Sequence, residues 1–403
     1  MPPSDQRDGI DLRALRHARH AKALAALRAA GVEAALLTKA ANIEYATGAA
    51  ARRGEASYDA SETAAALVTA SGAVHLFTNR SGGEVTDPRP TSTDVGFVLD
   101  DAVSVVDLVR ACRDRAGAVR RLAVDRLTAP LAAALRSSFG EPELVDADAV
   151  LASEKMRKTP EEIACLRRAQ ALNEAAMHVV VERIRPGVRE VTLSGLFMAE
   201  MARHGVRSCH VEPVWCALPR TTASAPWPHT GAPYRELTSS RMLEEGDLVV
   251  IDTGVLYEGY MSDFGRTWYC TASGAHPSAA ERDLYRRWRE IADAVAAACR
   301  PGATCLGLRR AAREAAGGDS PWPSSLYLAH GIGLGGVEPP FVGTDFGEAA
   351  EEQMILHPGM VLVIEPYVWI EGVGGYRAEE SYLVTARGAE RLSDCPHGAL
   401  AEA

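Results

Sequence analysis

The chain has 403 residues, more than one hydrophobic core usually supports, so we expect two domains. Its composition, 47% hydrophobic and 24% charged, is typical of an ordinary globular protein. The formal net charge of −10 argues against nucleic acid as a partner, because contacts to phosphate need a positive field. No apolar run is long enough to span a membrane and the first residues lack a secretory leader, so we expect a cytoplasmic protein without a membrane partner. The eight cysteines contain no C-x-x-C pair, and we expect them to be reduced and mostly buried.

Residues 1–150 alternate between helical and strand patterns, which predicts a small α/β domain. A hairpin is expected around Ser71-Gly72, and the polar, turn-rich segment 80–94 is expected to be a loop. The predicted elements are, in chain order, a helix at 12–30, strands at 32–38, 64–70 and 73–78, a helix at 103–112, a strand at 121–124 and a helix from Pro130.

A second domain, residues 151–403, opens with a strong helix signal. Thr159 can cap a helix, Pro160 suits its first position, and Glu162 completes a capping box. Apolar residues then recur every three or four positions from Ile163 to Ile184, which predicts a long amphipathic helix.

From residue 248 onward the sequence favours apolar strands interrupted by helices. Strands from such distant parts of the chain must share a sheet, so we expect an α+β domain with mostly antiparallel pairing. The strands are predicted at 248–252, 260–270, 361–365 and 381–385, and the helices near 279–298 and 306–316.

Two aspartates stand on neighbouring predicted strands of this domain. Asp252 and Asp263 lie on either side of a predicted hairpin connection at 255–260, so pairing of the strands would bring their carboxylates together. An aspartate at the end of a strand also commonly caps a turn, and for Asp252 alone that interpretation stays open.

His330, Glu365 and Glu379 complete the candidate residues. His330 precedes the glycine-rich segment 331–336, whose bare backbone would let a bound group come close, although a buried structural histidine is the alternative. Glu365 ends an apolar strand, where burial of an unpaired carboxylate costs several kcal/mol and therefore predicts a partner or a cation. Glu379 stands at the entry to a strand with Arg377 on the same face. An ordinary surface ion pair is the alternative for both glutamates.

Together these residues would supply four carboxylates and one imidazole, the ligand set of a two-metal hydrolytic centre. Four carboxylates brought together would repel one another, and two divalent cations would neutralise them. An oxygen-rich set with one imidazole favours Mn²⁺, Fe²⁺ or Co²⁺, with Zn²⁺ as a further candidate.

Two other motifs fit the sequence less well. Gly331-x-Gly333-x-x-Gly336 matches a dinucleotide fingerprint, but no strongly predicted strand leads into it and Pro339-Pro340 forbids the required helix. Asp252-Thr-Gly matches the aspartic protease triplet, but that chemistry needs a second such triplet, which the sequence lacks.

The order of the motifs resembles the pita-bread metallopeptidase family, which includes Xaa-Pro aminopeptidase, prolidase, methionine aminopeptidase and the metal-free relative creatinase. Upstream, Ala41–Gly48 is similar to the creatinase/prolidase N-terminal domain and Lys158–Ile163 to the helix that opens the catalytic domain. The resemblance covers roughly residues 12–392 and implies a homodimer with a pita-bread catalytic domain and a smaller N-terminal α/β domain. The motifs are Asp-x-Gly at 252–254, Ser-Asp-x-x-Arg-Thr at 262–267, His-Gly-Ile-Gly-Leu at 330–334, Ile-Glu-Pro at 364–366 and Arg-x-Glu-Glu at 377–380.

The resemblance implies a role for each candidate residue by position. It implies that Asp252 binds one metal, that Asp263 and Glu379 bridge, and that His330 and Glu365 complete the other site, with Glu365 also carrying the proton of a bridging water. His229 is similar to the family's first active-site histidine, which contacts the substrate or leaving group, and Arg377 is similar to an arginine that orders the site. The implied function is a dinuclear metal-dependent hydrolase that cleaves a C–N amide bond of a small peptide or specialised metabolite with a metal-bridging hydroxide.

The sequence departs from the peptidase pattern at Val337, where the peptidases carry a second histidine seven residues beyond the ligand histidine. That histidine helps to stabilise the tetrahedral intermediate, so Val337 argues against peptide cleavage but not against metal binding. The segment 234–240 is an insertion that would reshape the pocket wall. Two alternatives therefore stay open: a non-peptidase of the ectoine hydrolase or lyase type, although the lyase pattern has an aspartate in place of Gly254, and a metal-binding scaffold without catalysis.

Overall fold

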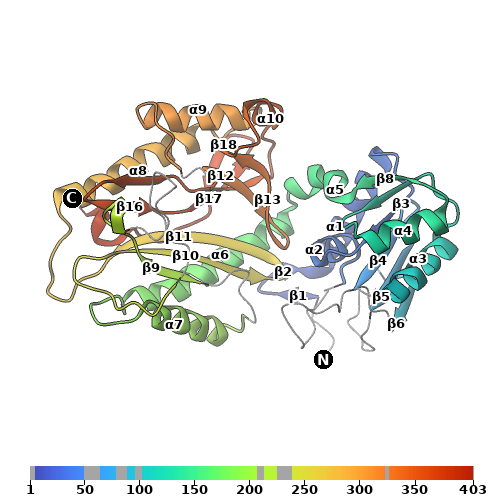
Figure 1. Ribbon diagram of the computed structural model, residues 1–403, viewed down its shortest axis with the longest axis horizontal. Coiled ribbons are helices and arrows are strands. Elements are labelled where there is room, and N and C mark those ends of the chain that lie inside the picture. Colours follow the sequence, from blue (N-terminus) through green and yellow to red (C-terminus); the bar gives the residue numbers. More distant parts are fainter. Residues whose placement is uncertain are drawn as a thin grey trace. The chain divides into compact units, whose positions relative to one another are not determined.

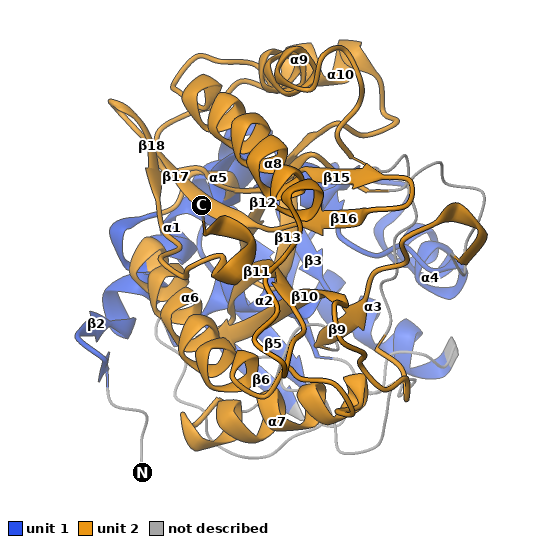
Figure 2. Cartoon of the chain, turned by 90° about the vertical axis from the view of Figure 1, so that its left-hand side faces the viewer, with its two compact units in different colours: residues 1–155, 159–161 blue, residues 156–158, 162–403 orange. Residues whose placement is uncertain are grey.

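The computed structural model describes residues 5–49, 64–78, 89–95, 102–206, 213–224, 238–322 and 326–402. The chain forms two compact units, residues 1–155 with 159–161 and residues 156–158 with 162–403 (Figure 2). Residue 150, the predicted boundary, lies within helix α5 (Ala147–Met156) of the first unit.

The first unit is built on a mixed sheet with the strand order β6-β5-β4-β3-β7-β8. The hairpin predicted around Ser71-Gly72 joins β4 to β5, which are antiparallel, whereas β3–β7, β5–β6 and β7–β8 are parallel. Helices α3 and α4 bury apolar side chains such as Leu108 and Leu135 against Leu36 and Leu122 of the sheet. The strands are β1 (Gln6–Arg7), β2 (Ile10–Asp11), β3 (Ala34–Leu37), β4 (Ala65–Thr69), β5 (Val74–Thr78), β6 (Ser92–Val95), β7 (Arg121–Val124) and β8 (Glu143–Asp146), and the helices before α5 are α1 (Leu12–Ala29), α2 (Ala40–Thr47), α3 (Ala102–Ala116) and α4 (Ala129–Phe139).

The predicted loop at 80–94 is wrong at its end, because Ser92–Val95 forms strand β6 beside β5. The polar side chains of this strand, which suggested a loop, contact other polar side chains and do not pack into an apolar core. His75 Nδ1 lies 2.9 Å from Ser92 Oγ, and Asp94 pairs with Arg115 at 2.6 Å. A strand whose side chains are satisfied in this way carries no hydrophobic alternation.

The second unit arranges two sheets between helices (Figure 1). Helices α6 and α7 lie along β9, β10 and β11, and α8 and α9 cover the side of β12 to β17. Every strand pair of its described part is antiparallel, as predicted. The sheets have the orders β11-β10-β9 and β13-β12-β14-β17-β18, with β15 and β16 as a separate ribbon. The helices are α6 (Pro160–Val181), α7 (Glu190–Arg203), α8 (Ala279–Ala298), α9 (Cys305–Ala315), α10 (Glu348–Gln353) and the 3₁₀ turns η1 (Thr222–Ser224) and η2 (Gly398–Ala401); the strands are β9 (Val214–Ala217), β10 (Leu248–Tyr257), β11 (Tyr260–Tyr269), β12 (Ala329–Gly333), β13 (Gly336–Val342), β14 (Val361–Ile364), β15 (Tyr367–Ile370), β16 (Gly374–Arg377), β17 (Glu380–Thr385) and β18 (Gly388–Arg391).

Strands β10 and β11 form a longer hairpin than the sequence predicted. Tyr257 pairs with Tyr260, so the connection is only Glu258-Gly259 and not the whole of 255–260. Both residues have positive φ, 48° and 80°, the conformation that two-residue hairpin turns require. The tight turn fixes the pairing of all ten residues on each strand.

The apolar face of helix α8 packs against the second sheet and the β15–β16 ribbon. Ser278 and Glu281 form a capping box at its start, with Glu281 N donating to Ser278 Oγ at 3.3 Å. Trp288 is fully buried in the same cluster as Ile364 and Tyr376. The strands that carry candidate ligands therefore pack against a buried apolar layer.

The glycine-rich segment is a strand that the sequence did not predict. Gly331 and Gly333 lie within β12, where an added Cβ would overlap the backbone at Pro339 and the carboxylate of Glu338. Glycine is poor in strands by propensity, which hid β12, but here it permits close packing against β13.

No helix within the described ranges is long and apolar enough to cross a membrane. Among the cysteines that these ranges include, none forms a disulfide, and all are buried except the half-buried Cys395.

Candidate metal centre

The hairpin brings Asp252 and Asp263 to one face. Asp252 pairs with Gly265 and Asp263 with Gly254, so the two aspartates occupy diagonal positions on neighbouring strands. Side chains at such positions project to the same side of the sheet and lie within reach of each other.

The other three candidate residues come from the second sheet and its flanks. His330 lies on β12 beside Val363 of β14, Glu365 follows β14 directly, and Glu379 lies between β16 and β17. His330 Nε2 is 3.2 Å from Asp263 Oδ2 and 3.3 Å from Glu365 Oε1. One carboxylate oxygen each of Asp252, Asp263 and Glu379 lie within 4.8 Å of one another. The structure thus gathers all five predicted residues in one cluster.

Arg377, at the end of β16, is the arginine of this cluster. Its Nη1 lies 2.9 Å from Asp252 Oδ2, its Nη2 lies 2.6 Å from Glu379 Oε1, and it also pairs with Glu365. Thr267 Oγ1 accepts the Arg377 backbone N–H at 2.9 Å and fixes the strand that carries it. Arg377 therefore draws together carboxylates from both sheets.

Arg377 does not offset the burial of the carboxylates in this cluster, as the pKa values of Asp252 and Glu379 show. Burial raises the pKa of Asp252 to about 6, against the effect of Arg377, and the charges of Asp263 and Glu365 add to the rise. Burial also raises the pKa of Glu379 well above its ordinary value despite Arg377. Burial acts in the same direction on Asp263, but the hydrogen bond and charge of His330 outweigh it and lower that pKa.

One buried carboxylate oxygen of the cluster is suited to bind a cation. Glu379 Oε2 is buried and has no hydrogen-bond partner in the described part of the chain. An unpaired buried carboxylate oxygen is costly, and a divalent ion would satisfy it. The oxygen-rich donor set with a single imidazole therefore fits divalent cations.

Three residues whose roles the sequence did not predict position the cluster, and Gly265 is the first. A Cβ at this position would lie 2.9 Å from Ile251 O and 3.0 Å from Glu379 Cδ. Glu379 N also donates to Gly265 O at 3.0 Å. Glycine thus lets Glu379 cross β11 to reach the aspartates.

Arg266 and Asn173 are the other two. Buried Arg266 donates from Nη1 to the carbonyl oxygens of Gly265 and Glu379, each at 2.8 Å, and from Nη2 to Glu380 Oε1 at 3.2 Å. Asn173 of α6 donates to Thr253 O at 2.8 Å and Ser262 Oγ at 3.1 Å, on the hairpin face opposite the aspartates. Asn173 stands four residues after Ala169 in the predicted apolar stripe, and a polar residue at that spacing is the signal that could have revealed it.

The remaining predicted residues fall into two groups. His229 and residues 234–237 of the predicted insertion at 234–240 lie outside the described residues. Val337 lies on β13 opposite Ile332 and is 42% exposed.

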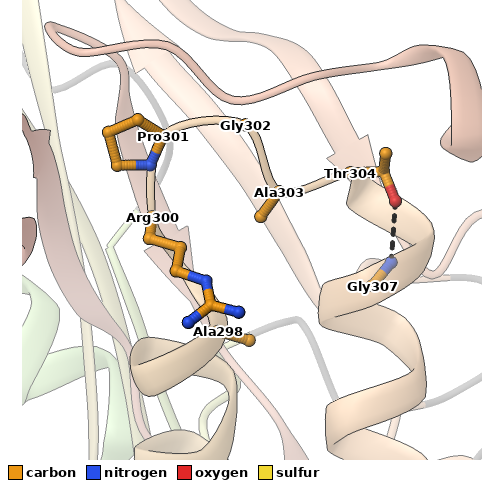
Figure 3. Close-up of a pocket in the computed structure, with 7 residues that line it drawn as sticks. All are labelled: Ala298, Arg300, Pro301, Gly302, Ala303, Thr304 and Gly307. Atoms are coloured by element: carbon orange, nitrogen blue, oxygen red, sulfur yellow. Dashed lines mark hydrogen bonds between the residues drawn. The ribbon is translucent and has the colours of Figure 1, made fainter.

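A separate cavity of about 380 Å³ lies between the end of α8 and the start of α9 (Figure 3). Thr304 caps α9 there by accepting the Gly307 N–H at 3.1 Å, and exposed Arg300 is the charged residue of the lining. With no acidic or imidazole side chain in its lining, this cavity carries none of the chemistry described above.

Comparisons with known proteins cover both units. The profile of metallopeptidase family M24 matches residues 164–386, and the profile of the creatinase/prolidase N-terminal domain matches residues 19–158. The chain is 30% identical to the Xaa-Pro dipeptidase of Pyrococcus furiosus over 250 residues, which is 61% of this chain and 65% of that enzyme, so the match spans just under two thirds of that relative. It is 24% identical to the uncharacterized peptidase YqhT of Bacillus subtilis over 91% of this chain and 95% of YqhT. The crystal structure of dipeptidase PepE from Mycobacterium ulcerans superposes with a TM-score of 0.75 at 25% identity, covering 97% of this chain and 98% of PepE.

Proposed function

Since the chain belongs to metallopeptidase family M24, we propose that it is a metal-dependent hydrolase that cleaves a C–N amide bond of a short peptide or a small metabolite. The predicted family resemblance and the predicted α+β fold, a pita-bread catalytic domain with a smaller N-terminal α/β domain, are confirmed by the same matches. The observation that carries the proposal is the convergence of Asp252, Asp263, His330, Glu365 and Glu379 on one buried point.

The geometry supports two divalent ions in this cluster. Asp252 would hold one ion, and His330 with Glu365 would hold the other. Asp263 contacts His330 on one side and lies near Asp252 on the other, which suits a bridging ligand, and Glu379 reaches the same point. When bound, two such ions lower the pKa of a shared water and polarise a substrate carbonyl oxygen.

The chain's own residues would then position groups and move protons. Arg377 holds Asp252, Glu365 and Glu379 in place through its guanidinium. Glu365, buried beside His330, would take a proton at its carboxylate and return it to the departing nitrogen. His229 would contact the substrate or its leaving group.

Val337 favours a second candidate, a non-peptidase of the ectoine hydrolase or lyase type that acts on a small metabolite. An apolar side chain cannot donate a hydrogen bond to a developing oxyanion. We also propose a homodimer, as the family resemblance implies, which light scattering of the purified protein would test. We propose a cytoplasmic location from the sequence analysis, which fractionation of cells that express the protein would test.

Metal content of ligand variants tests the proposal. Wild-type protein should hold close to two divalent ions per chain, Asp263→Asn and Glu379→Gln should lose both together, and Asp252→Asn should lose mainly one. Asp345→Asn, at an exposed acid after β13, is the control and should retain both. Elemental analysis of the purified proteins gives the answer, and full activity of metal-free wild-type protein would contradict the dinuclear centre and support a creatinase-like reaction.

A further inference from the structure

A row of aromatic rings leads from the candidate ligand His330 toward solvent. The Tyr327 ring lies 5.4 Å from the His330 ring in an edge-on arrangement at 71° and 5.4 Å from the Phe341 ring. Phe341 in turn lies 6.4 Å from Phe346, which is 71% exposed. Ring separations in this range are those of aromatic pairs in contact.

Strand β13 places more apolar surface on the same side. Phe341 pairs directly with His330, and Val337 pairs directly with Ile332 two residues further along β12, with a register shift on β13 between the two pairs. Directly opposed residues of an antiparallel pair project to the same face, so Phe341 and Val337 lie on the face that carries His330. We call Tyr327, Val337, Phe341 and Phe346 the apolar wall.

The charged residue of β13 is turned away from this wall. Glu338 is buried on the opposite face, where it pairs with the buried Lys158 and packs its carboxylate against Gly333. None of the four wall residues carries a charge, and Tyr327 is the only one of them with a polar group, its hydroxyl. An apolar group of a ligand that displaces water from this wall would stabilise the complex, because apolar surface is removed from water on both sides.

We propose that the apolar wall is a substrate subsite that takes an uncharged apolar group, preferably aromatic, attached next to the scissile bond. The inference rests on the proposed hydrolase function, because it takes the ligand His330 as the position of the reaction. It narrows the substrate class from any small amide to amides with an apolar substituent.

Hydroxamates test the wall without knowledge of the substrate, because their common head group chelates divalent ions and their tails differ. Affinities of acetohydroxamate, 3-phenylpropionohydroxamate and succinic monohydroxamate for the full-length, metal-loaded protein would be measured by calorimetry. The phenyl compound should bind about tenfold more tightly than acetohydroxamate, or better, from the apolar area that it buries. The succinic compound should show no gain.

Variants of the wall residues test whether the tighter binding of the phenyl compound depends on the apolar wall. Phe341→Ala and Tyr327→Ala should reduce the phenyl advantage to about threefold or less, and Phe341→Leu should keep most of it. Phe346→Ala removes the most exposed ring of the wall and should also reduce the advantage. Leu196→Ala on α7, 40% exposed, is the control that should keep the full advantage. An undiminished advantage in the three alanine variants of the wall, or a preference for the succinic tail, would overturn the subsite. Failure of metal-loaded protein to bind acetohydroxamate would instead overturn the proposed metal centre, and the subsite with it.

Discussion

Asn173 and Thr253 exchange two hydrogen bonds behind the acidic cluster. Asn173 Nδ2 donates to Thr253 O and Thr253 Oγ1 donates to Asn173 Oδ1, each over 2.8 Å. Thr253 follows Asp252 in the chain, and Ser262, which Asn173 also contacts, precedes Asp263. One fully buried side chain of α6 therefore fixes both strands that carry the aspartates.

Asn173→Leu should destabilise the protein and weaken metal binding together. Unpaired buried polar groups cost about 1–3 kcal/mol, which urea unfolding would measure. Metal titration should show lower affinity, because the aspartates lose their fixed spacing. Gln170→Leu is the control: Gln170 is equally buried but hydrogen-bonds Glu174 within its own helix, so metal affinity should stay unchanged. A destabilised Asn173 variant with wild-type metal affinity would reduce Asn173 to a purely structural role.

His229→Ala should leave the metal content intact while turnover falls by roughly 10² or more, the range for a positioned proton-transfer group. The physical reason is that the resemblance assigns His229 to the substrate and not to the ions. Elemental analysis and steady-state kinetics on the same preparation separate the two effects. Loss of metal from this variant would make His229 a ligand.

Val337 predicts weak or absent cleavage of Xaa-Pro dipeptides and tripeptides by the metal-loaded protein, with better turnover of a non-peptide amide. Removal of one oxyanion donor typically costs about 10² to 10³ in rate. Val337→His should therefore raise residual peptidase activity if the pocket admits a peptide. A kcat/KM on the order of 10⁴ M⁻¹s⁻¹ for Xaa-Pro substrates in the wild type would refute this expectation.

Glu245 provides a pH dependence that is separate from the metal centre. Hydrogen bonds from Ser273, Thr271 and the Ala272 N–H lower its pKa from 4.5 to about 2. A carboxylate with a lowered folded-state pKa stabilises the protein above pH 4.5, and that contribution is lost as the pH falls from 4.5 through about 2. Glu245→Gln should accordingly lower the Tm at pH 7 by more than at pH 3, whereas exposed Asp319→Asn should show no such trend. An equal loss at both pH values would exclude this linkage.

Patterns within a short stretch of sequence predicted their elements well. The helix predicted at 279–298 is α8, and the helix predicted from Pro160 is α6, because each has a capping signal and an apolar stripe. Helix α7 was missed although Leu193, Phe197 and Met201 recur at helical spacing. Strands β12 and β13 were missed because both contain several glycine or proline residues, which are poor strand formers.

The candidate ligands were found because each stands in a distinctive local context. Gly265 and Asn173 have no such context, and Arg266 belongs to the motif at 262–267 without a role predicted for it, since the roles of all three arise from contacts across the fold. Asn173 meets Thr253 across 80 positions, and Arg266 meets Glu379 across 113. Only the pairing of the strands and the docking of α6 create these contacts.

The close approach at Gly265 sets a limit on how this centre can be redesigned. Any side chain there would press on the Ile251 carbonyl and on Glu379, at 2.9 and 3.0 Å, whatever its chemistry. A mutant library aimed at new substrates should therefore keep glycine at this position and place its diversity on positions 337, 341 and 346, whose side chains are partly or largely exposed. Natural drift of the sequence faces the same constraint, so the backbone beneath the carboxylates is less free to change than the surface that meets the substrate.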